Sequence, residues 1–346
     1  MIIITKSGLY IHIPFCQNKC PYCDFYSVKY NCDDAEKYCN KVINEMQHYN
    51  GAFDTIYVGG GTPSIIEPAL IGKILNSARN QFDIDSNSEI TIECNPSKDL
   101  REAFKLYKSY GINRISLGMQ SAVDKERFAL GRSAGKIQVA KTINDAKNAG
   151  IENISLDLML GTPKQTISSL DETFEFIEKI NVKHISAYML KIEDGTKFYE
   201  IQNQLNLPDD DSVSDMYLKT IRILSSLGFK QYEISNFARP GYESRHNIKY
   251  WKLVPYLGLG ESAHSFWHGK RFFYDESFNI IQDGPGGDES EKIMLGLRLN
   301  EGIEKSLIKK DYKQFVNMGL IKETATKIAL TERGMLVSNT IINELI

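Results

Sequence analysis

The sequence predicts an α/β fold in which parallel strands alternate with helices, followed by a small, mainly helical appendage. Hydrophobic residues make up 42% of the 346 residues and charged residues 25%, proportions that are typical of globular proteins and that exclude a disordered or fibrous chain. Short β-branched runs alternate with longer amphipathic segments, which is the pattern of βαβ units. These segments share no repeated motif, so a solenoid is excluded.

The six predicted strands are short apolar runs with an amphipathic segment between most of them. Glycines stand directly after three of the helical patterns, at positions 111, 150 and 228, where they indicate helix C-termini. The strands are expected at residues 9–13, 55–58, 89–93, 114–117, 154–158 and 184–188. The helices are expected at residues 33–49, 67–79, 99–110, 136–149, 168–179 and 212–227.

Composition divides the chain into three regions, 1–228, 229–287 and 288–346. The first holds the strand-helix repeats, and the second is rich in Tyr, Gly and Asn and is expected to be irregular. Residues 283–288 are the best candidate for a linker. The third reads as short helices around a strand at 328–331, resembling a winged helix. It carries nine basic and nine acidic side chains, so a packing or partner domain is favoured over a DNA-binding one.

Two absences indicate the cellular compartment. No apolar run approaches the ~18 residues that a membrane helix needs, and residues 1–6 are too short for a signal peptide, so a cytoplasmic protein without an integral membrane segment is expected. The net charge of -3 gives no overall basic excess for nucleic acid. Three of the six cysteines lie within eight residues, which in a reducing compartment favours a metal site over disulfides.

The clustered cysteines follow the first predicted strand with the spacing Cys16-x3-Cys20-x2-Cys23. A structural zinc site closes with four ligands, and a cubane iron–sulfur cluster normally takes four thiolates. Three thiolates would leave one iron open for a substrate or cofactor. Zinc completed by His12 or Asp24, or no metal at all, remains an alternative on the spacing alone.

The residues around these cysteines, YIHIPFC at 10–16 and CPYCDF at 20–25, resemble the radical S-adenosylmethionine (SAM) superfamily. Within it they are similar to the branch containing oxygen-independent coproporphyrinogen dehydrogenase (HemN) and the heme chaperone HemW. The resemblance covers nearly the whole chain and implies a partial (β/α)6 barrel with a shortened C-terminal domain. It also implies a [4Fe–4S] cluster on Cys16, Cys20 and Cys23, whose open iron binds SAM and whose electron cleaves it to a 5′-deoxyadenosyl radical.

The expected SAM site lies at the carboxyl ends of the strands, where parallel α/β barrels gather their functional residues. Glycines at 59–61 would let the backbone approach a ligand closely, and Arg132 could pair with a carboxylate in a bidentate manner. By resemblance, the glycine loop holds the methionyl amine, while Glu93, Gln120 and Asp157 contact the rest of SAM. The expected SAM contacts are Tyr10, Tyr22, Gly60, Gly61, Thr62, Glu93, Gln120, Arg132 and Asp157.

Two features argue against the dehydrogenase activity of the branch. The dehydrogenase has a further cysteine two residues past the third cluster cysteine, where this chain has Phe25, and a long N-terminal extension, where this chain has nine residues before Tyr10. Residues 246–251, HNIKYW, match the HNxxYW motif associated with heme binding in the HemW family. Neutral imidazole is a common heme ligand and aromatic faces suit a macrocycle. The expected heme contacts are His246, Tyr250 and Trp251, with His264 as a second candidate.

Three functional hypotheses result. The favoured one is a heme chaperone that keeps the cluster and SAM site; the resemblance implies heme-accepting apoproteins, a heme donor such as bacterioferritin and an electron donor as partners. The second is a radical SAM enzyme, either the oxygen-independent coproporphyrinogen III oxidase (dehydrogenase) or another porphyrin-modifying enzyme. The third is a zinc or cluster protein in which the barrel is only a scaffold.

Overall fold

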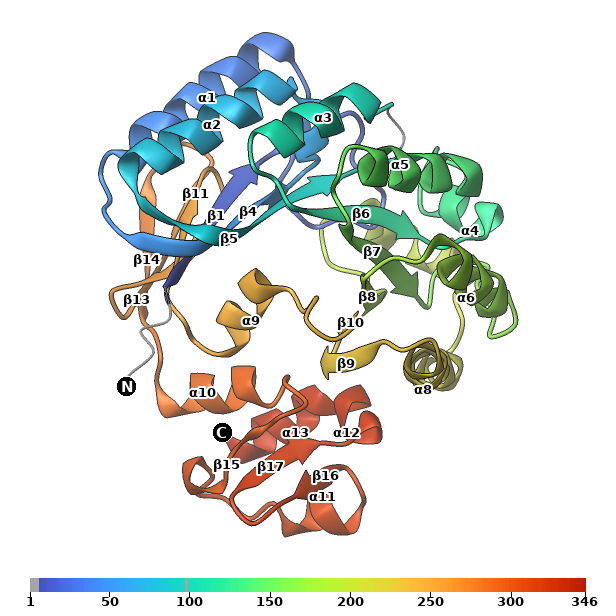
Figure 1. The fold of residues 1–346 in the computed structure, drawn as a ribbon. Helices are drawn as coiled ribbons and strands as arrows, with labels where there is room; N and C mark the ends of the chain where they lie inside the picture. The colour runs from blue at the N-terminus through green and yellow to red at the C-terminus, as the bar shows by residue number, and fades with distance from the viewer. Residues whose placement is uncertain (1–5, 97–98) are drawn as a thin grey trace.

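A computed structural model describes residues 6–96 and 99–346 (Figure 1). Its main sheet has the strand order β14-β13-β12-β11-β1-β4-β5-β6-β7-β8-β10-β9. The six strands expected from the sequence form the parallel centre of this sheet in chain order, so the predicted partial barrel is confirmed. They are β1 (Ser7–Ile13), β4 (Ala52–Gly60), β5 (Asp83–Cys94), β6 (Arg114–Gln120), β7 (Asn153–Leu160) and β8 (His184–Met189).

Helices cover the convex face of these strands, as the βαβ pattern predicted (Figure 1). The apolar sides of strands and helices meet in one core, in which Ile11, Ile56 and Val42 have no exposed surface. The first helix begins after Asn31, whose side chain accepts the backbone N–H groups of Asp33 and Asp34. The covering helices are α1 (Cys32–Met46), α2 (Pro68–Gln81), α3 (Arg101–Ser109), α4 (Asp124–Ala129), α5 (Lys136–Asn148), α6 (Ser169–Ile180) and α8 (Asp210–Ser226).

The expectation of an irregular region at 229–287 was wrong. Strands β9 (Lys230–Glu233) and β10 (Asn236–Ala238) extend one edge of the main sheet. The other edge is extended by β11 (Tyr256–Leu259), β12 (His264–Trp267), β13 (Lys270–Tyr274) and β14 (Ile280–Pro285), so the candidate linker at 283–288 begins inside a strand. Between the two sets, helix α9 (Arg245–Trp251) lies on the concave side of the sheet (Figure 1).

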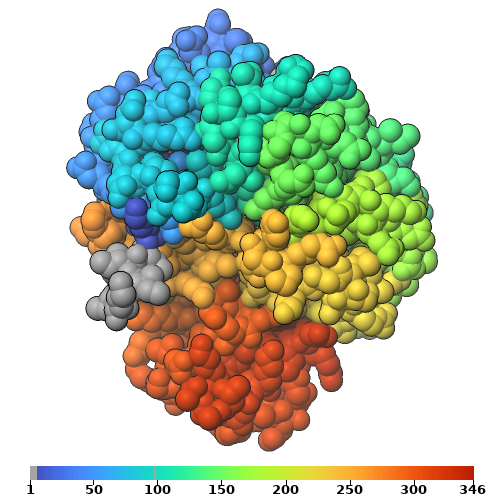
Figure 2. All heavy atoms as spheres, viewed as in Figure 1, coloured from blue at the N-terminus to red at the C-terminus, as the bar shows by residue number. Residues whose placement is uncertain are grey.

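The C-terminal region forms a small unit below α9 and β9 (Figures 1 and 2). Its antiparallel sheet has the order β15-β17-β16, and its helices pack around this sheet, in agreement with the predicted winged-helix-like appendage. A hydrogen bond from Tyr217 Oη to the sulfur of Met335 ties the unit to α8. Its elements are α10 (Glu289–Gly296), β15 (Ile303–Glu304), α11 (Lys313–Asn317), β16 (Ile321–Glu323), β17 (Lys327–Leu330), α12 (Glu332–Leu336) and α13 (Ser338–Leu345).

The helices were also compared with the length and apolarity that a membrane crossing requires. Across residues 6–96 and 99–346, none of them is long and apolar enough to span a bilayer. The expectation that residues 1–6 are not a signal peptide concerns a segment of which residues 1–5 lie outside the described part of the chain.

Candidate functional site

The three clustered cysteines lie on one loop at the carboxyl end of β1. Strand β2 (Phe15–Cys16) pairs in parallel with β3 (Val28–Lys29) and closes this loop, so Cys20 and Cys23 lie between the two paired segments. The backbone N–H of Cys23 donates to the carbonyl of Cys20 over 3.1 Å, which turns the chain tightly between them. All three side chains are partly exposed. The loop therefore presents the three thiols together at the mouth of the barrel.

The three thiols influence one another without converging on a point. Burial raises the pKa of Cys23, and the nearby Cys20 and Cys16 raise it further, while Lys19 lowers it. In the part of the chain that the structure describes, no three His, Cys, Asp or Glu side chains meet as ligands of a single metal ion.

The glycine loop after β4 lies flush against the cysteine loop. A Cβ on Gly61 would stand 2.8 Å from backbone atoms of Pro14 and Phe15, so no larger residue fits without moving the cysteine loop. The Gly61 N–H donates to the Ile13 carbonyl over 2.9 Å, and the Thr62 N–H donates to Phe15 over 2.8 Å. These bonds fix Thr62 beside the first cysteine, with 3.5 Å between the Thr62 Oγ1 and Cys16 Sγ atoms.

A cavity of about 310 Å³ opens between these loops. Its volume is at the lower end of the range for small-molecule sites, ~300–1,000 Å³. Three of the residues expected from the sequence, Cys20, Thr62 and Arg132, contribute to its wall. The remaining lining residues are Gln17, Asn18, Ser64, Ile65, Asn95, Gly131 and Ser133. The cavity thus joins a cluster cysteine to the expected carboxylate-binding arginine.

Arg132 is held in place by Tyr22 of the cysteine loop. Its Nε and Nη2 atoms donate to the Tyr22 Oη over 3.2 and 2.7 Å. Burial alone would lower the pKa of Arg132, but Tyr22, Cys20 and Cys23 outweigh it and raise the pKa, so the side chain stays cationic. A Cβ on Gly118 would lie 3.2 Å from Gln120 Nε2 and 3.6 Å from Arg132 Nη1, so both side chains converge on that backbone position.

Gln120 itself is strained, because its φ of 71° places a non-glycine residue in the left-handed region. Such conformations cluster at functional sites, where the surrounding structure compensates for the strain. Here the strain occurs at the last residue of β6, and the Gln120 side chain approaches Gly118 on the side where the Arg132 guanidinium also lies.

The two predicted carboxylates at the barrel mouth are bound by donors that the sequence analysis missed. Glu93 accepts from the Tyr57 hydroxyl over 2.8 Å and from the Gly60 N–H over 3.1 Å, and burial raises the pKa of Glu93 to about 7. Asp157 accepts from the Ser116 hydroxyl over 3.1 Å, and burial raises its pKa as well. The sequence did hold a signal for these two donors. Side chains two residues apart on a strand point to the same face, and Tyr57 and Ser116 each stand two residues before a glycine at the carboxyl end of a strand.

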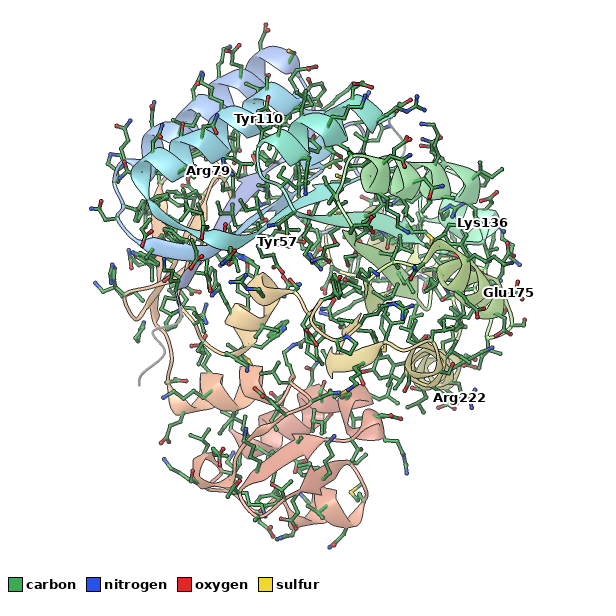
Figure 3. All side chains as sticks on the ribbon, viewed as in Figure 1. Tyr57, Arg79, Tyr110, Lys136, Glu175 and Arg222 are labelled. Atoms are coloured by element: carbon green, nitrogen blue, oxygen red, sulfur yellow. The ribbon has the colours of Figure 1, made fainter. Side chains whose placement is uncertain are left out.

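The HNIKYW segment forms α9, which packs against the opposite, amino-terminal end of the strands. A Cβ on Gly8, near the start of β1, would stand 3.0 Å from His246 Cε1. Glu89 accepts the backbone N–H groups of Arg245 and His246 over 3.2 and 3.1 Å. In Figure 3 the labelled Tyr57 lies on the α9 side of the sheet, and its ring centroid is 5.3 Å from that of His246.

His246 has no exposed surface and no free ring nitrogen. Its Nδ1 lies 2.8 Å from Thr55 Oγ1, and its Nε2 lies 2.8 Å from the Tyr250 hydroxyl. Burial, reinforced by Lys249 and Arg114, lowers the pKa of His246 to about 3. The Arg298 guanidinium stacks 4.4 Å from the centroid of the Trp251 ring. In this conformation His246 is a packed, hydrogen-bonded residue and does not present a nitrogen to a ligand.

Two further histidines lie near the barrel mouth. His12 is buried between the Tyr10 hydroxyl, 3.0 Å from its Nδ1, and the Tyr26 carbonyl, 3.3 Å from its Nε2; burial lowers its pKa to about 4. His264 is exposed on β12 and stacks on Phe273. Tyr10 contacts His12 and lies near Tyr57, at a ring distance of 6.2 Å, and it does not line the 310 Å³ cavity.

Comparisons with known proteins give a consistent picture. A family model described as the radical SAM superfamily matches residues 10–177. Heme chaperone HemW of Lactococcus lactis is 30% identical over 98% of this chain and 97% of that relative. Heme chaperone HemW of Escherichia coli is 31% identical over 99% and 98%. The solved structure of coproporphyrinogen III oxidase (HemN) from Escherichia coli superposes with a TM-score of 0.82 at 20% identity, over 99% and 90%, which shows a shared fold.

Proposed function

The chain belongs to the HemW family of the radical SAM superfamily, and on that premise we propose that it is a heme chaperone, which binds heme and transfers it to acceptor proteins. The observation that carries the proposal is the similarity to heme chaperones along nearly the whole of both chains. Heme-accepting apoproteins, a heme donor such as bacterioferritin and an electron donor are the partners proposed with it. A cytoplasmic location is proposed as well.

Membership of the superfamily implies a [4Fe–4S] cluster and SAM, and this chain offers residues that suit both. We propose Cys16, Cys20 and Cys23 as the cluster ligands. Reductive cleavage of SAM is the chemistry that the cluster supplies when bound. The chain's own contribution is positioning: Arg132 provides a fixed cation for a carboxylate, and Glu93 and Asp157 offer acceptors for hydroxyl groups. Gly60 packs against the His12 ring, Gly61 against the backbone just before Cys16, and Thr62 lies 3.5 Å from the Cys16 sulfur, so we propose these three residues for the backbone side of the SAM site.

A second candidate function is coproporphyrinogen III dehydrogenase, since the residues expected for SAM binding are present in the sequence and the HemN fold is shared. Phe25 argues against it. This residue stands where the dehydrogenase has its extra cysteine, and 65% of its surface is exposed beside the cysteine loop. A phenyl ring can neither bind a metal nor exchange a proton. The chaperone proposal therefore predicts that the protein keeps the residues of a SAM site but does not convert coproporphyrinogen III.

Heme binding is proposed to involve the segment that contains His246, Tyr250 and Trp251. Because His246 is enclosed, α9 in this conformation would contribute to heme binding through packing and not through a bond from His246 to the iron. Tyr250 connects α9 to the sheet extension, since its ring centroid lies 4.5 Å from that of Tyr256 on β11. The heme-associated segment and the exposed face of that extension are thus neighbours.

The test uses the full chain with its cluster reconstituted under anaerobic conditions. Heme titration should give a saturable Soret shift at about one heme per chain. Incubation with coproporphyrinogen III, SAM and a reductant should yield no protoporphyrinogen, with HemN as the positive control. Robust turnover, or heme uptake no better than nonspecific adsorption to albumin, would refute the chaperone proposal and favour the enzyme.

A further inference from the structure

The histidines of the described chain fall into two groups. His12, His184 and His246 are buried, and each has both ring nitrogens within hydrogen-bond distance of protein atoms. His48, His264 and His268 are exposed. A heme iron needs a ring nitrogen that is accessible and unprotonated. On the premise of the proposed heme binding, the buried group offers no such nitrogen without disruption of its hydrogen bonds.

We propose that His264 is the axial heme ligand, on an exposed seat formed by His264, Phe273 and Ile281 of β12, β13 and β14. These three residues are direct cross-strand partners in the sheet register, His264 with Phe273 and Phe273 with Ile281. Side chains of paired residues stand on the same face of a sheet, about 4.5–5.5 Å apart. They therefore form a continuous row across the edge of the sheet.

The row combines a ligand with apolar surface. The His264 and Phe273 rings stack at a centroid distance of 5.0 Å and an interplanar angle of 24°. The stacked Phe273 ring would hold the His264 imidazole in one orientation from the side and leave its ring nitrogens free. Ile281 is 40% exposed at the end of the row, where it can cover part of a macrocycle. Within residues 6–96 and 99–346, no protein hydrogen bond occupies either nitrogen of His264.

The protonation state of His264 also suits iron. Partial burial and Arg271 lower the pKa of His264, although Asp283 opposes them, and the lowered pKa favours the neutral imidazole that can bind iron. The opposite face of the strands is closed, because Ser265, Trp267 and Phe272 are buried there. On the His264 side Phe266 is buried as well, so a ligand can approach only at the row of His264, Phe273 and Ile281, whose first and last members are exposed.

The other two exposed histidines lack such surroundings. His48 follows α1 on the outer surface, and its Nδ1 pairs with Glu45 over 3.4 Å. His268 lies in the β12–β13 turn with a φ of 51°, and its ring meets Trp267 edge-on. Neither has a row of cross-strand apolar partners. Both serve as matched controls for an exposed imidazole outside the seat.

The position of the seat also gives the HNIKYW helix a role. Tyr250 packs edge-on against Tyr256, which is the cross-strand partner of Phe266, and Phe266 shares the face of His264. The Tyr256 hydroxyl accepts from Arg271 Nη1 over 3.1 Å, which ties β11 to β13. We therefore assign His246 and Tyr250 a positioning role: through the packing of Tyr250 against β11 they hold in place β12, the strand that carries His264.

The experiment is a heme titration of the full chain and of five variants, followed by absorbance and electron paramagnetic resonance. His264→Ala should lose the histidine-ligated spectrum and bind heme about tenfold or more weakly, and added imidazole should restore the spectrum. Phe273→Ala should bind more weakly with an unchanged Soret position. His268→Ala and His48→Ala should match the unmodified protein in both affinity and spectrum.

The outcomes distinguish the assignment of His264 as the heme ligand from the proposed function, heme binding itself. Saturable heme binding by the unmodified protein together with an unchanged His264→Ala variant would overturn the His264 assignment alone. Failure of the unmodified protein to bind heme would overturn the proposed function itself. Loss of the ligated spectrum in His246→Gln, with the thermal unfolding curve unchanged, would transfer the ligand role to His246. Retention of the histidine-ligated spectrum with weaker heme affinity at a temperature where the variant is fully folded would support its positioning role, and unchanged affinity would overturn that role.

Discussion

The two ends of the barrel strands are built in contrasting ways. At the carboxyl end, the cysteines are partly exposed, a cavity opens beside Arg132, and Gln120 is held in a strained conformation. At the amino end, α9 packs against the strands, and His246 is enclosed with both of its nitrogens bonded. The contrast teaches that a polar residue in a barrel can mark either a ligand site or a closure, and that exposure and free hydrogen-bonding capacity separate the two.

The largest effect is expected at the cysteine loop. Replacement of Cys16, Cys20 or Cys23 by Ala should abolish the [4Fe–4S] cluster, because a cluster with only two protein thiolates is poorly held. Iron and sulfide content and the broad absorbance of the reconstituted protein measure this loss. Cys32→Ala is the matched control, since Cys32 is exposed nearby at the start of α1 and should leave the cluster intact. Cluster loss in that control would mean that the ligand set is incorrect.

The second effect concerns SAM affinity at the same end. Arg132→Ala should weaken SAM binding to the reconstituted protein at least tenfold, because removal of one partner of a buried charged contact typically costs ~2–5 kcal/mol. Tyr22→Phe keeps the ring but removes the hydroxyl that orients Arg132, and should weaken binding less. Calorimetry compares both with Arg101→Ala, an exposed arginine on α3. Unchanged affinity in Arg132→Ala would exclude Arg132 from the site.

The smallest effect is a difference in how the two ends respond to pH. The pKa of His246 is about 3 in the folded protein and ordinarily 6.5. Below pH 6.5 the unfolded chain therefore binds a proton at this residue that the folded protein does not bind, so the free energy of unfolding falls on acidification. The pKa of Glu93 is about 7 in the fold and 4.5 ordinarily, so stability falls as the pH rises through that window. The two ends therefore change the free energy of unfolding with pH in opposite directions.

Urea unfolding between about pH 4 and pH 8 measures these slopes. His246→Gln should reduce the loss of stability on acidification by about 1–3 kcal/mol, and Glu93→Gln should reduce the loss on alkalinisation. Parallel profiles in the protein and in both buried-site variants would contradict the opposition between the two ends.

Sequence reasoning was most successful where a residue's role follows from local pattern. The central strands, their covering helices except the short α4, and the cysteine loop could be predicted, since each is specified by neighbours in the chain. The edge strands could not, because β11 finds its partner in β1: Leu257 pairs with Leu9. Likewise, the motif containing His246 gave no indication of burial, since Thr55 and Glu89, which bind that helix, come from distant strands. Burial and hydrogen-bond partners emerge only once those segments have assembled.

The link between Tyr26 and Glu261 has a consequence for biosynthesis. The Tyr26 hydroxyl donates to Glu261 across 235 positions of sequence, and β11, which covers the edge of β1, is made at nearly the same late stage. At typical rates of translation the ribosome needs roughly 10–50 s to cover that interval. Throughout it, the nascent cysteine loop lacks its brace and β1 presents an open edge, the kind of edge on which chains aggregate. The brace on the cysteine loop and the cover on β1 thus become available together, only after most of the chain has been made.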